Sequence, residues 1–144
     1  MSMAIVDASV GIKWYVPEVH TPEAHQWLNG PDELHTLSVF FDIEIANILW
    51  KKVRQAEITQ AQAEAVIAQL QTVPMIRHPE PVLLGAALDL AVRIQRTVYD
   101  CLYLALAMQL SGYMVTADQR FFNSLAGTPW ASYVCWIANV PSAP

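Results

Sequence analysis

The chain has 144 residues, of which 54% are hydrophobic and 15% charged. Soluble domains carry about 25% charged residues, so this composition excludes an intrinsically disordered chain and favours a surface that a partner covers. The length suits one domain spanning residues 1–144 with a sizeable core. With 8 basic and 13 acidic residues the formal charge is −5, which argues against a broad basic field for holding nucleic acid.

The cysteines and the ends of the chain exclude other classes. Cys101 and Cys135 lack zinc-ligand spacing and are too few for a disulfide framework, so we expect reduced thiols in a cytoplasmic protein. The first residues contain no basic segment, unlike a signal peptide. Residues 121–144 carry no charge, but Gly127 and Pro129 interrupt them, so we expect no membrane span. This stretch is either an ordinary helix end, loop and strand or a surface that meets another subunit.

Taken in chain order, the hydrophobic pattern predicts strands that alternate with helices. An apolar run ends at Asp7, and Thr21 with Pro22 marks a helix start, as N-cap and first helical residue. Pro74 weakens the third strand or places it at an edge. The expected strands are residues 4–6, 34–37, 73–76, 113–116 and 133–137. The expected helices are residues 8–15, 21–28, 40–54, 59–70, 81–94, 100–110 and a short one through 121–125.

This alternation predicts an α/β fold with a central, mostly parallel five-stranded sheet that helices cover on both faces. Right-handed crossovers bring the carboxyl ends of parallel strands to one edge of the sheet, where α/β proteins build their sites. The helix over residues 100–110 is apolar on nearly every side, so we expect it to be buried.

Four of the thirteen acids have apolar neighbours, where a carboxylate is unfavourable unless it is paired or binds a metal. Asp7 and Asp118 each follow an apolar strand. Glu44 lies between two isoleucines inside a helix, and Asp100 opens the most apolar helix. The other acids are expected at the solvated surface: Glu18, Glu23, Asp32, Glu33, Glu57, Glu64, Glu80 and, on helices, Asp42 and Asp89.

Helix capping is the alternative explanation of these four residues. It would suffice for Asp100 or Asp118 alone, but Glu44 lies in mid-helix, where a cap has no use. The strand ends put Asp7 and Asp118 at one edge of the sheet, and the helices that carry Glu44 and Asp100 begin near it. Four carboxylates so close cannot all stay ionised without a cation, and hard oxygen ligands select Mg²⁺ or Mn²⁺. Such a pocket suits phosphoryl transfer with two metal ions.

Rival chemistries have less support. The four histidines, at positions 20, 25, 35 and 78, are expected in loops and helix flanks, at the surface and away from the acids. No dinucleotide-binding or P-loop glycine motif is present in the sequence. An aspartyl-nucleophile phosphatase would need a second acid at position 9, where the chain has Ser9.

Four segments together resemble the PIN-domain family, in particular the VapC-type toxins of bacterial and archaeal toxin–antitoxin pairs. They follow in the family's order over essentially the whole chain, a combination far more specific than any one of them. The segments are Ile5-Val6-Asp7-Ala8-Ser9, Glu44-Ile45-Ala46-Asn47-Ile48-Leu49, Tyr99-Asp100-Cys101-Leu102-Tyr103-Leu104-Ala105-Leu106-Ala107, and Val115-Thr116-Ala117-Asp118 followed by Phe121.

The resemblance implies a metal-dependent endoribonuclease with a PIN-like three-layer α/β/α fold. Asp7, Glu44, Asp100 and Asp118 match the family's acidic quartet, which makes them the implied catalytic residues and metal ligands. The first three would hold one Mg²⁺ or Mn²⁺ ion. Asp118, together with Asp7, would support a second ion or its waters.

Smaller polar residues also match positions beside that site in the family. Ser9, Asn47 and Thr116 would support the ligands, and Asn47 shares a helical face with Glu44. A local backbone hydrogen bond would explain Ser9 and Thr116 equally well. Asn123 is the nearest match to a further polar position of the family.

The same resemblance implies a cognate antitoxin and a toxin homodimer, and no membrane contact is expected. Contacts from basic residues to the RNA backbone, with few bases read, would recognise a structured RNA by its shape. Basic residues would flank the pocket, or else serve only as cations at helix ends. The uncharged C-terminal segment and five tryptophans are candidates for the protein contacts, although a tryptophan is more often a core residue than an interface hot spot. The alternatives are a PIN-like binding module without catalysis and a PIN nuclease of RNA processing without an antitoxin. The basic residues are Lys51, Lys52, Arg54, Arg93 and Arg96, and the tryptophans are Trp14, Trp27, Trp50, Trp130 and Trp136.

Overall fold

The computed structural model describes residues 2–141, which contain a five-stranded sheet in the order β3-β2-β1-β4-β5. Every neighbouring pair of strands is parallel, so the predicted sheet is confirmed. The first strand lies at the centre, and later strands add on either side of it. The strands are β1 (Met3–Val6), β2 (Glu33–Leu37), β3 (Ile76–His78), β4 (Tyr113–Thr116) and β5 (Val134–Trp136).

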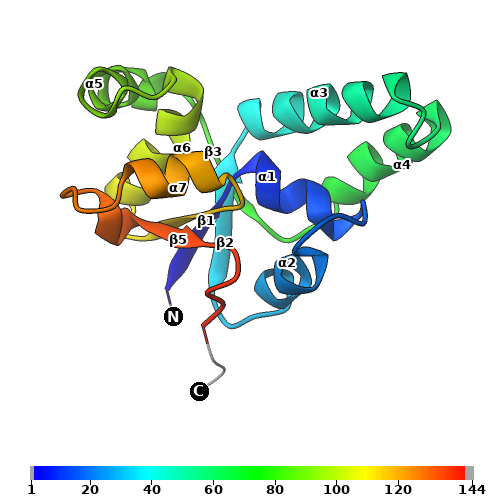
Figure 1. The fold of residues 1–144 in the computed structure, drawn as a ribbon, viewed down its shortest axis with the longest axis horizontal. Helices are drawn as coiled ribbons and strands as arrows, with labels where there is room; N and C mark the ends of the chain where they lie inside the picture. The colour runs from blue at the N-terminus through cyan, green and yellow to red at the C-terminus, as the bar shows by residue number, and fades with distance from the viewer. Residues whose placement is uncertain (1, 142–144) are drawn as a thin grey trace.

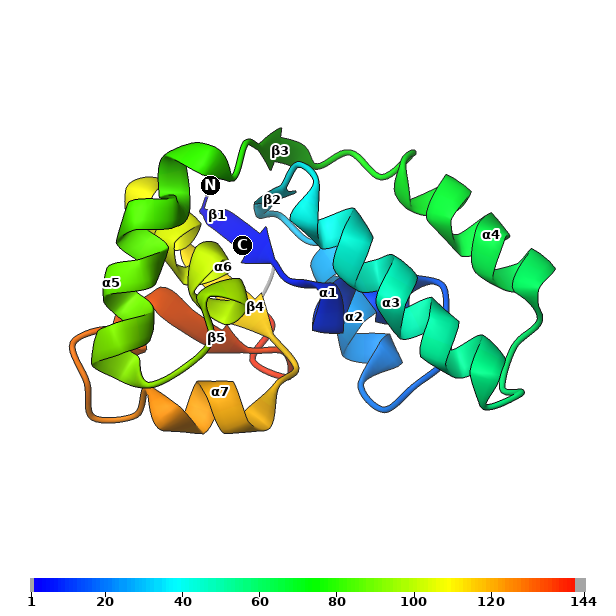
Figure 2. The ribbon, with the colours of Figure 1, turned by 90° about the horizontal axis from the view of Figure 1, so that it is seen from above.

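Helices lie on both sides of this sheet, as the predicted layers require. The α-helices of the described part are α1 (Ala8–Gly11), α2 (Thr21–Leu28), α3 (Phe40–Arg54), α4 (Gln60–Leu70), α5 (Leu84–Ile94), α6 (Val98–Gln109) and α7 (Gln119–Ser124). Three 3₁₀ turns accompany them, namely η1 (Ile12–Trp14), η2 (Pro81–Leu83) and η3 (Ala131–Tyr133). In Figure 1, α3 and α4 form a pair that extends away from the sheet. Figure 2 shows α5 and α6 on one side of the strands and α3 and α4 on the other.

The core forms where the apolar faces of these elements meet. Residues 4–6 of β1 are completely buried. On α3 the buried residues Phe41, Ile45 and Leu49 recur every fourth position, which gives the helix one stripe facing the core. Residues 101–107 of α6 are all buried. The prediction that this helix is buried is therefore confirmed over residues 101–107.

The tryptophans divide between core and surface. Trp14 and Trp27 are core residues whose indole N–H groups donate to backbone carbonyls at 2.9 and 2.8 Å. These two are therefore core tryptophans, the alternative weighed for them, and not candidates for a protein contact. Trp50 is exposed, and the guanidinium of Arg54 lies 4.8 Å from the centre of its ring.

Several boundaries differ from the prediction because strand pairing and capping decide them. The third strand begins at Ile76 rather than at residue 73, since its partner is the stretch of β2 from His35. It lies at the edge of the sheet, one of the two outcomes expected from Pro74. The N-cap of α2 is His20, whose φ of 68° ends the preceding loop, and Thr21 is the first helical residue.

The histidine prediction is also wrong in part. His35 is buried within β2, and His78 is the last residue of β3. Their rings stack with centroids 5.1 Å apart, and Nδ1 of His35 lies 2.8 Å from Nε2 of His78. Glu33 lies 2.6 Å from the other nitrogen of His35. These polar groups join β2 to the edge strand and so serve the sheet.

Glu80, expected as a solvated residue, caps α3 from a distant part of the chain. Its carboxylate accepts hydrogen bonds from the Ser38 hydroxyl at 2.8 Å and from the backbone N–H groups of Val39 and Phe40 at 2.7 and 2.5 Å. Burial alone would raise the pKa of Glu80, but these hydrogen bonds outweigh it and hold the pKa below its ordinary value. The cap fixes the start of the helix that carries Glu44.

Both cysteines are free thiols, and Cys101 is buried whereas Cys135 is half-buried. Among residues 2–141, no helix combines the length and the apolar character needed to cross a membrane.

Candidate active site

Asp7 lies where β1 ends and α1 begins, and it is only 7% exposed. Its Oδ1 accepts the N-cap hydrogen bond of α1 from the backbone N–H of Val10 at 3.1 Å. The same oxygen accepts from the Ser9 hydroxyl at 2.5 Å, and Oδ2 accepts from the Thr116 hydroxyl at 2.7 Å. Both oxygens of Asp7 are therefore held by groups from two neighbouring strand ends.

Asp118 follows β4, the strand beside β1 in the sheet. Its Oδ1 accepts a hydrogen bond from the backbone N–H of Phe121 at 3.0 Å, which makes Asp118 the N-cap of α7. The capping explanation therefore holds for Asp118, and it also holds for Asp7. Both residues nevertheless lie at the predicted edge of the sheet.

Two hydroxyl groups connect these acids. The Ser9 hydroxyl donates to Asp7 and accepts from the backbone N–H of Ala117 at 2.9 Å. The Thr116 hydroxyl donates to Asp7 and accepts from the backbone N–H of Asp118 at 3.0 Å. Each hydroxyl therefore holds an acid and also binds the backbone, and the expected local backbone hydrogen bond is found for Thr116, whereas that of Ser9 joins residues 108 positions apart. Support of metal ligands by Ser9 and Thr116 stays a prediction.

Glu44 is held by a residue that sequence reasoning missed as a functional group. The Tyr103 hydroxyl donates to Oε1 of Glu44 at 2.5 Å, although the two residues lie on different helices, α3 and α6. Tyr103 is 2% exposed, and burial first, then the nearby carboxylate, raises its pKa far above the ordinary tyrosine range. The phenol therefore keeps its proton and acts as a donor.

Asp100 lies in the first turn of α6 but does not open or cap it. The helix begins at Val98, and the hydroxyl of Thr97 accepts the capping bond from the backbone N–H of Asp100 at 3.3 Å. The same hydroxyl lies 3.3 Å from Oδ2 of Asp100. The capping explanation of Asp100 is therefore wrong, and its carboxylate is not needed to cap α6.

The charges of these carboxylates act on one another. Burial raises the pKa of Asp7 to about 6, with the charge of Asp100 adding to the effect and hydrogen bonds opposing it. Burial raises the pKa of Glu44 to about 7, and the charges of Asp7 and Asp100 add to that rise. Burial, followed by the charge of Asp118, raises the pKa of Asp100. Without a cation, Glu44 is therefore partly protonated near pH 7.

The donor chemistry of the edge fits a hard cation. Within residues 2–141, only one oxygen of each of Glu44, Asp100 and Asp118 takes part in a hydrogen bond, so the other remains available. Carboxylate oxygens are hard donors, which suit Mg²⁺ or Mn²⁺. In the same part of the chain, no three Asp, Glu, His or Cys side chains stand close enough to hold an ion. The edge is thus an open group of donors rather than a closed ligand cage.

The two asparagines considered from the sequence lie outside this network. Asn47 is exposed on α3, one turn after Glu44, and Asn123 is exposed on α7. Neither side chain makes a hydrogen bond to the acids in the described residues. The structure therefore brings Ser9 and Thr116 into the site, together with the unforeseen Tyr103, and leaves the asparagines at its margin.

Most of the basic residues expected to flank the site are occupied or distant. Lys52 pairs with Glu18 at 2.6 Å and with Glu57 at 3.3 Å, and Arg93 pairs with Asp89 at 3.0 Å. The simpler explanation, that they serve the helices, is sufficient for Lys52 and Arg93. Lys51 and Arg54 are exposed near the end of α3, about 10–15 Å along the helix from Glu44.

Arg96 remains beside the acids, and a second arginine joins it. Burial raises the pKa of Asp100, and the charge of Arg96 opposes that rise. The guanidinium of Arg96 donates to the carbonyl oxygen of Arg120 at 3.0 Å. Arg120 is exposed in the first turn of α7, two residues after Asp118, a spacing that the sequence already shows. The two arginines mark the α6–α7 side of the site.

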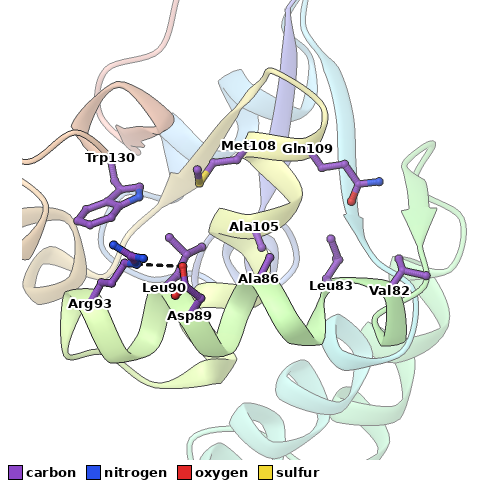
Figure 3. Close-up of a pocket in the computed structure, with 10 residues that line it drawn as sticks. All are labelled: Val82, Leu83, Ala86, Asp89, Leu90, Arg93, Ala105, Met108, Gln109 and Trp130. Atoms are coloured by element: carbon purple, nitrogen blue, oxygen red, sulfur yellow. Dashed lines mark hydrogen bonds and ion pairs between the residues drawn. The ribbon is translucent and has the colours of Figure 1, made fainter.

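A cavity of about 430 Å³ lies elsewhere, against α5, the later part of α6 and Trp130 (Figure 3). Its walls are mostly apolar, with the ion pair of Arg93 and Asp89 beside Leu90. None of the four acids lines it. This hollow is separate from the acidic edge.

Comparisons with known proteins agree with this arrangement. The sequence profile of the PIN domain matches residues 4–127. The chain is 33% identical over 118 residues to Ribonuclease VapC3 of Pyrobaculum aerophilum, an alignment that spans 81% of this chain and 89% of that protein. The parallel sheet with acids at its carboxyl edge defines an α/β protein of PIN-like architecture. The chain belongs to the PIN domain family.

Solved structures share the fold at lower sequence identity. PAE2754 from Pyrobaculum aerophilum has a TM-score of 0.68 at 24% identity and covers 88% of this chain and 82% of its own. A toxin–antitoxin complex from Klebsiella pneumoniae has a TM-score of 0.63 at 16% identity, covering 92% and 95%. FitAB bound to an IR36 DNA fragment has a TM-score of 0.61 at 16% identity, covering 97% and 99%. These likenesses confirm the three-layer fold.

Proposed function

We propose that the chain is a metal-dependent endoribonuclease and the toxin of a type II toxin–antitoxin pair. The observation that carries the proposal is the group of mutually repelling carboxylates at one sheet edge, with the pKa of Asp7 raised to about 6 and that of Glu44 to about 7. The relationship to Ribonuclease VapC3 supports an activity on RNA. The likeness to a toxin–antitoxin complex supports the biological setting, in which the toxin meets its RNA in the cytoplasm.

The four acids would hold the metal. Asp7, Glu44 and Asp100 would bind one Mg²⁺ or Mn²⁺ ion, and Asp118, with Asp7, would support a second. When bound, the ions supply a nucleophilic water at neutral pH and stabilise charge on the scissile phosphate. No three of these side chains stand close enough to hold an ion within residues 2–141, so they would move closer together on binding it. The chain's own hydrogen bonds restrict them beforehand, through backbone caps at Asp7 and Asp118 and through hydroxyl donors at Glu44 and Asp100.

Arg96 and Arg120 are the cations best placed to meet the RNA. They lie side by side on the α6–α7 side of the acids, and neither forms a salt bridge within residues 2–141. Guanidinium groups bind phosphate well, and contacts to the backbone alone recognise a structured RNA by shape. The net charge of −5 does not oppose this, because the four proposed ligand acids account for most of it.

An antitoxin and a second copy of the chain complete the proposed assembly. The likeness to a toxin–antitoxin complex supports the first of these partners. The described residues of the uncharged C-terminal segment contribute Phe121, Leu125 and Ile137 to the core, so this segment serves the fold at least in part. Large apolar side chains that are more than half exposed lie outside this segment, for example Leu88 and Val92 on α5 and Ile43 on α3.

Cleavage of a structured RNA by the purified chain tests the enzymatic proposal. We expect cleavage with Mg²⁺ or Mn²⁺, its loss in excess chelator and its return when Mn²⁺ is restored, measured on a labelled RNA in a gel. The Asp7→Asn protein, purified identically, controls for contaminating nucleases. Cleavage that persists in chelator contradicts the metal mechanism, and absence of metal-dependent cleavage across structured RNAs contradicts the nuclease function.

A further inference from the structure

The four acids are not held equally well. Asp7 and Asp118 accept backbone hydrogen bonds, whereas Glu44 is attached through a long side chain whose rotational freedom opposes a fixed position. Within residues 2–141, the only hydrogen-bond donor to the Glu44 carboxylate is the Tyr103 hydroxyl, at 2.5 Å from Oε1. The position of this carboxylate therefore depends on one phenol.

We propose that Tyr103 is a positioning residue that fixes Glu44 as a metal ligand with one oxygen available to the ion. The inference rests on the proposed function, since it assumes that the acidic edge binds Mg²⁺ or Mn²⁺. The phenol engages Oε1 and leaves Oε2 without a partner among the described residues. Hydrogen bonds from neighbouring side chains orient metal ligands in this way in many metal sites.

Because Tyr103 lies on α6, its contact with Glu44 links the helices that carry two of the proposed ligands. Asp100 and Tyr103 are three residues apart on that helix, so they share a face and one rigid element presents both a ligand and the donor to a second ligand. Glu44 comes from α3, which extends away from the sheet in Figure 1. The Tyr103 hydroxyl therefore sets the position of an α3 ligand relative to the α6 ligand.

Burial makes the contact specific. Tyr103 is 2% exposed, so its hydroxyl has little access to water and needs a partner within the protein. The ring of Phe40 packs against it, with centroids 6.3 Å apart, and against Tyr99, with centroids 5.1 Å apart. Tyr99 is 60% exposed, so it shares the helix and the aromatic neighbour of Tyr103 but not its burial. It is therefore a matched control.

The experiment measures Mn²⁺ binding to the purified full chain by calorimetry, without RNA. We expect Tyr103→Phe to weaken Mn²⁺ binding by about 10- to 100-fold, because the ring remains and only the donor is lost. Tyr99→Phe should bind Mn²⁺ as the unaltered chain does. Far-UV circular dichroism and urea unfolding establish that both variants are folded.

A second pair of variants separates positioning from general packing. In a chain that already carries Glu44→Ala, adding Tyr103→Phe should leave Mn²⁺ binding unchanged, since its route to the metal has gone. The inference is overturned if Tyr103→Phe binds Mn²⁺ as the unaltered chain does, or if it weakens Mn²⁺ binding equally in the presence and absence of Glu44. The proposed function stands in both cases. If the unaltered chain binds no Mn²⁺, the metal site fails, and this inference fails with it.

Discussion

The four carboxylates form two pairs that the protein holds in different ways. Asp7 and Asp118 end neighbouring strands, and each caps the helix that follows by accepting a backbone N–H. Glu44 and Asp100 lie on the sides of longer helices, and their carboxylates are held by the hydroxyls of Tyr103 and Thr97. The first pair serves the fold as well as the site.

This difference shows that an acid among apolar neighbours can have two different roles, a helix cap or a metal ligand. A cap explains why an aspartate follows a strand even in a protein without chemistry. No such explanation covers Glu44 and Asp100, whose pKa values burial raises and whose charges are unfavourable without a cation. Glu44 and Asp100, the pair on the helices, therefore point most directly to a metal-binding role. Substitutions of the two pairs should differ in their effects.

The largest expected effect is the loss of cleavage in Asp100→Asn. This change keeps the size of the side chain and removes a proposed ligand charge, so we expect metal-dependent RNA cleavage to fall more than about 100-fold. Stability should stay level or rise, because Asp100 does not cap α6. Initial rates on a labelled RNA and urea unfolding measure the two quantities. Asp89→Asn, an exposed acid on α5, is the control that should keep full activity.

A result of the opposite kind would remove the distinction between the pairs. If Asp100→Asn cleaved RNA within a few-fold of the unaltered chain, the helix-borne pair would have no special role. If it unfolded instead, its carboxylate would be part of the fold after all.

The next effect in size concerns stability without metal, and its sign follows from the pKa of Glu44. That pKa is about 7 in the folded chain against 4.5 for an ordinary glutamate. Between these values the folded state keeps a proton that the unfolded state has released. The free energy of unfolding contributed by this group therefore falls as the pH rises from about 4.5 to about 7.

Glu44→Gln removes this penalty because the amide never ionises. We expect the free energy of unfolding in chelator to rise by on the order of 2 kcal/mol at pH 8 and to change little at pH 4. Urea unfolding at both pH values measures it. The exposed Glu64→Gln on α4 should show no such pH dependence. Equal stability of Glu44→Gln and the unaltered chain at pH 8 would mean that ionised Glu44 does not destabilise the folded chain.

The sheet edge could be predicted because its signals are local. A short apolar run followed by an acid marks the strand end at Asp7 and again at Asp118, and the alternation of elements fixes the parallel sheet. The all-round apolar character of residues 101–107 likewise predicted a buried helix. Each of these features is contained in a few consecutive residues.

The features that could not be predicted depend on residues far apart in the chain. Tyr103 is one large side chain among many in an apolar helix, and only the folded chain brings its hydroxyl to Glu44, 59 positions earlier. Glu80 caps α3 from about forty positions away. His35 was predicted at the surface, but it is buried and lies within hydrogen-bond distance of His78 on β3. Tertiary packing brings such residues together, so a local sequence pattern cannot predict that they are in contact.

The smallest effect tests the strand-end pair, where cap and charge can be separated at Asp118. Asparagine caps a helix as well as aspartate does, so Asp118→Asn should leave the free energy of unfolding unchanged. Alanine cannot accept the hydrogen bond from Phe121, so Asp118→Ala should lower it by about 1 kcal/mol. If Asp118 also supports a metal ion, both variants should lose cleavage to a similar extent. If Asp118→Ala loses cleavage but Asp118→Asn keeps it, activity follows stability. Asp118 would then be a helix cap only, and the other three acids would bind the metal.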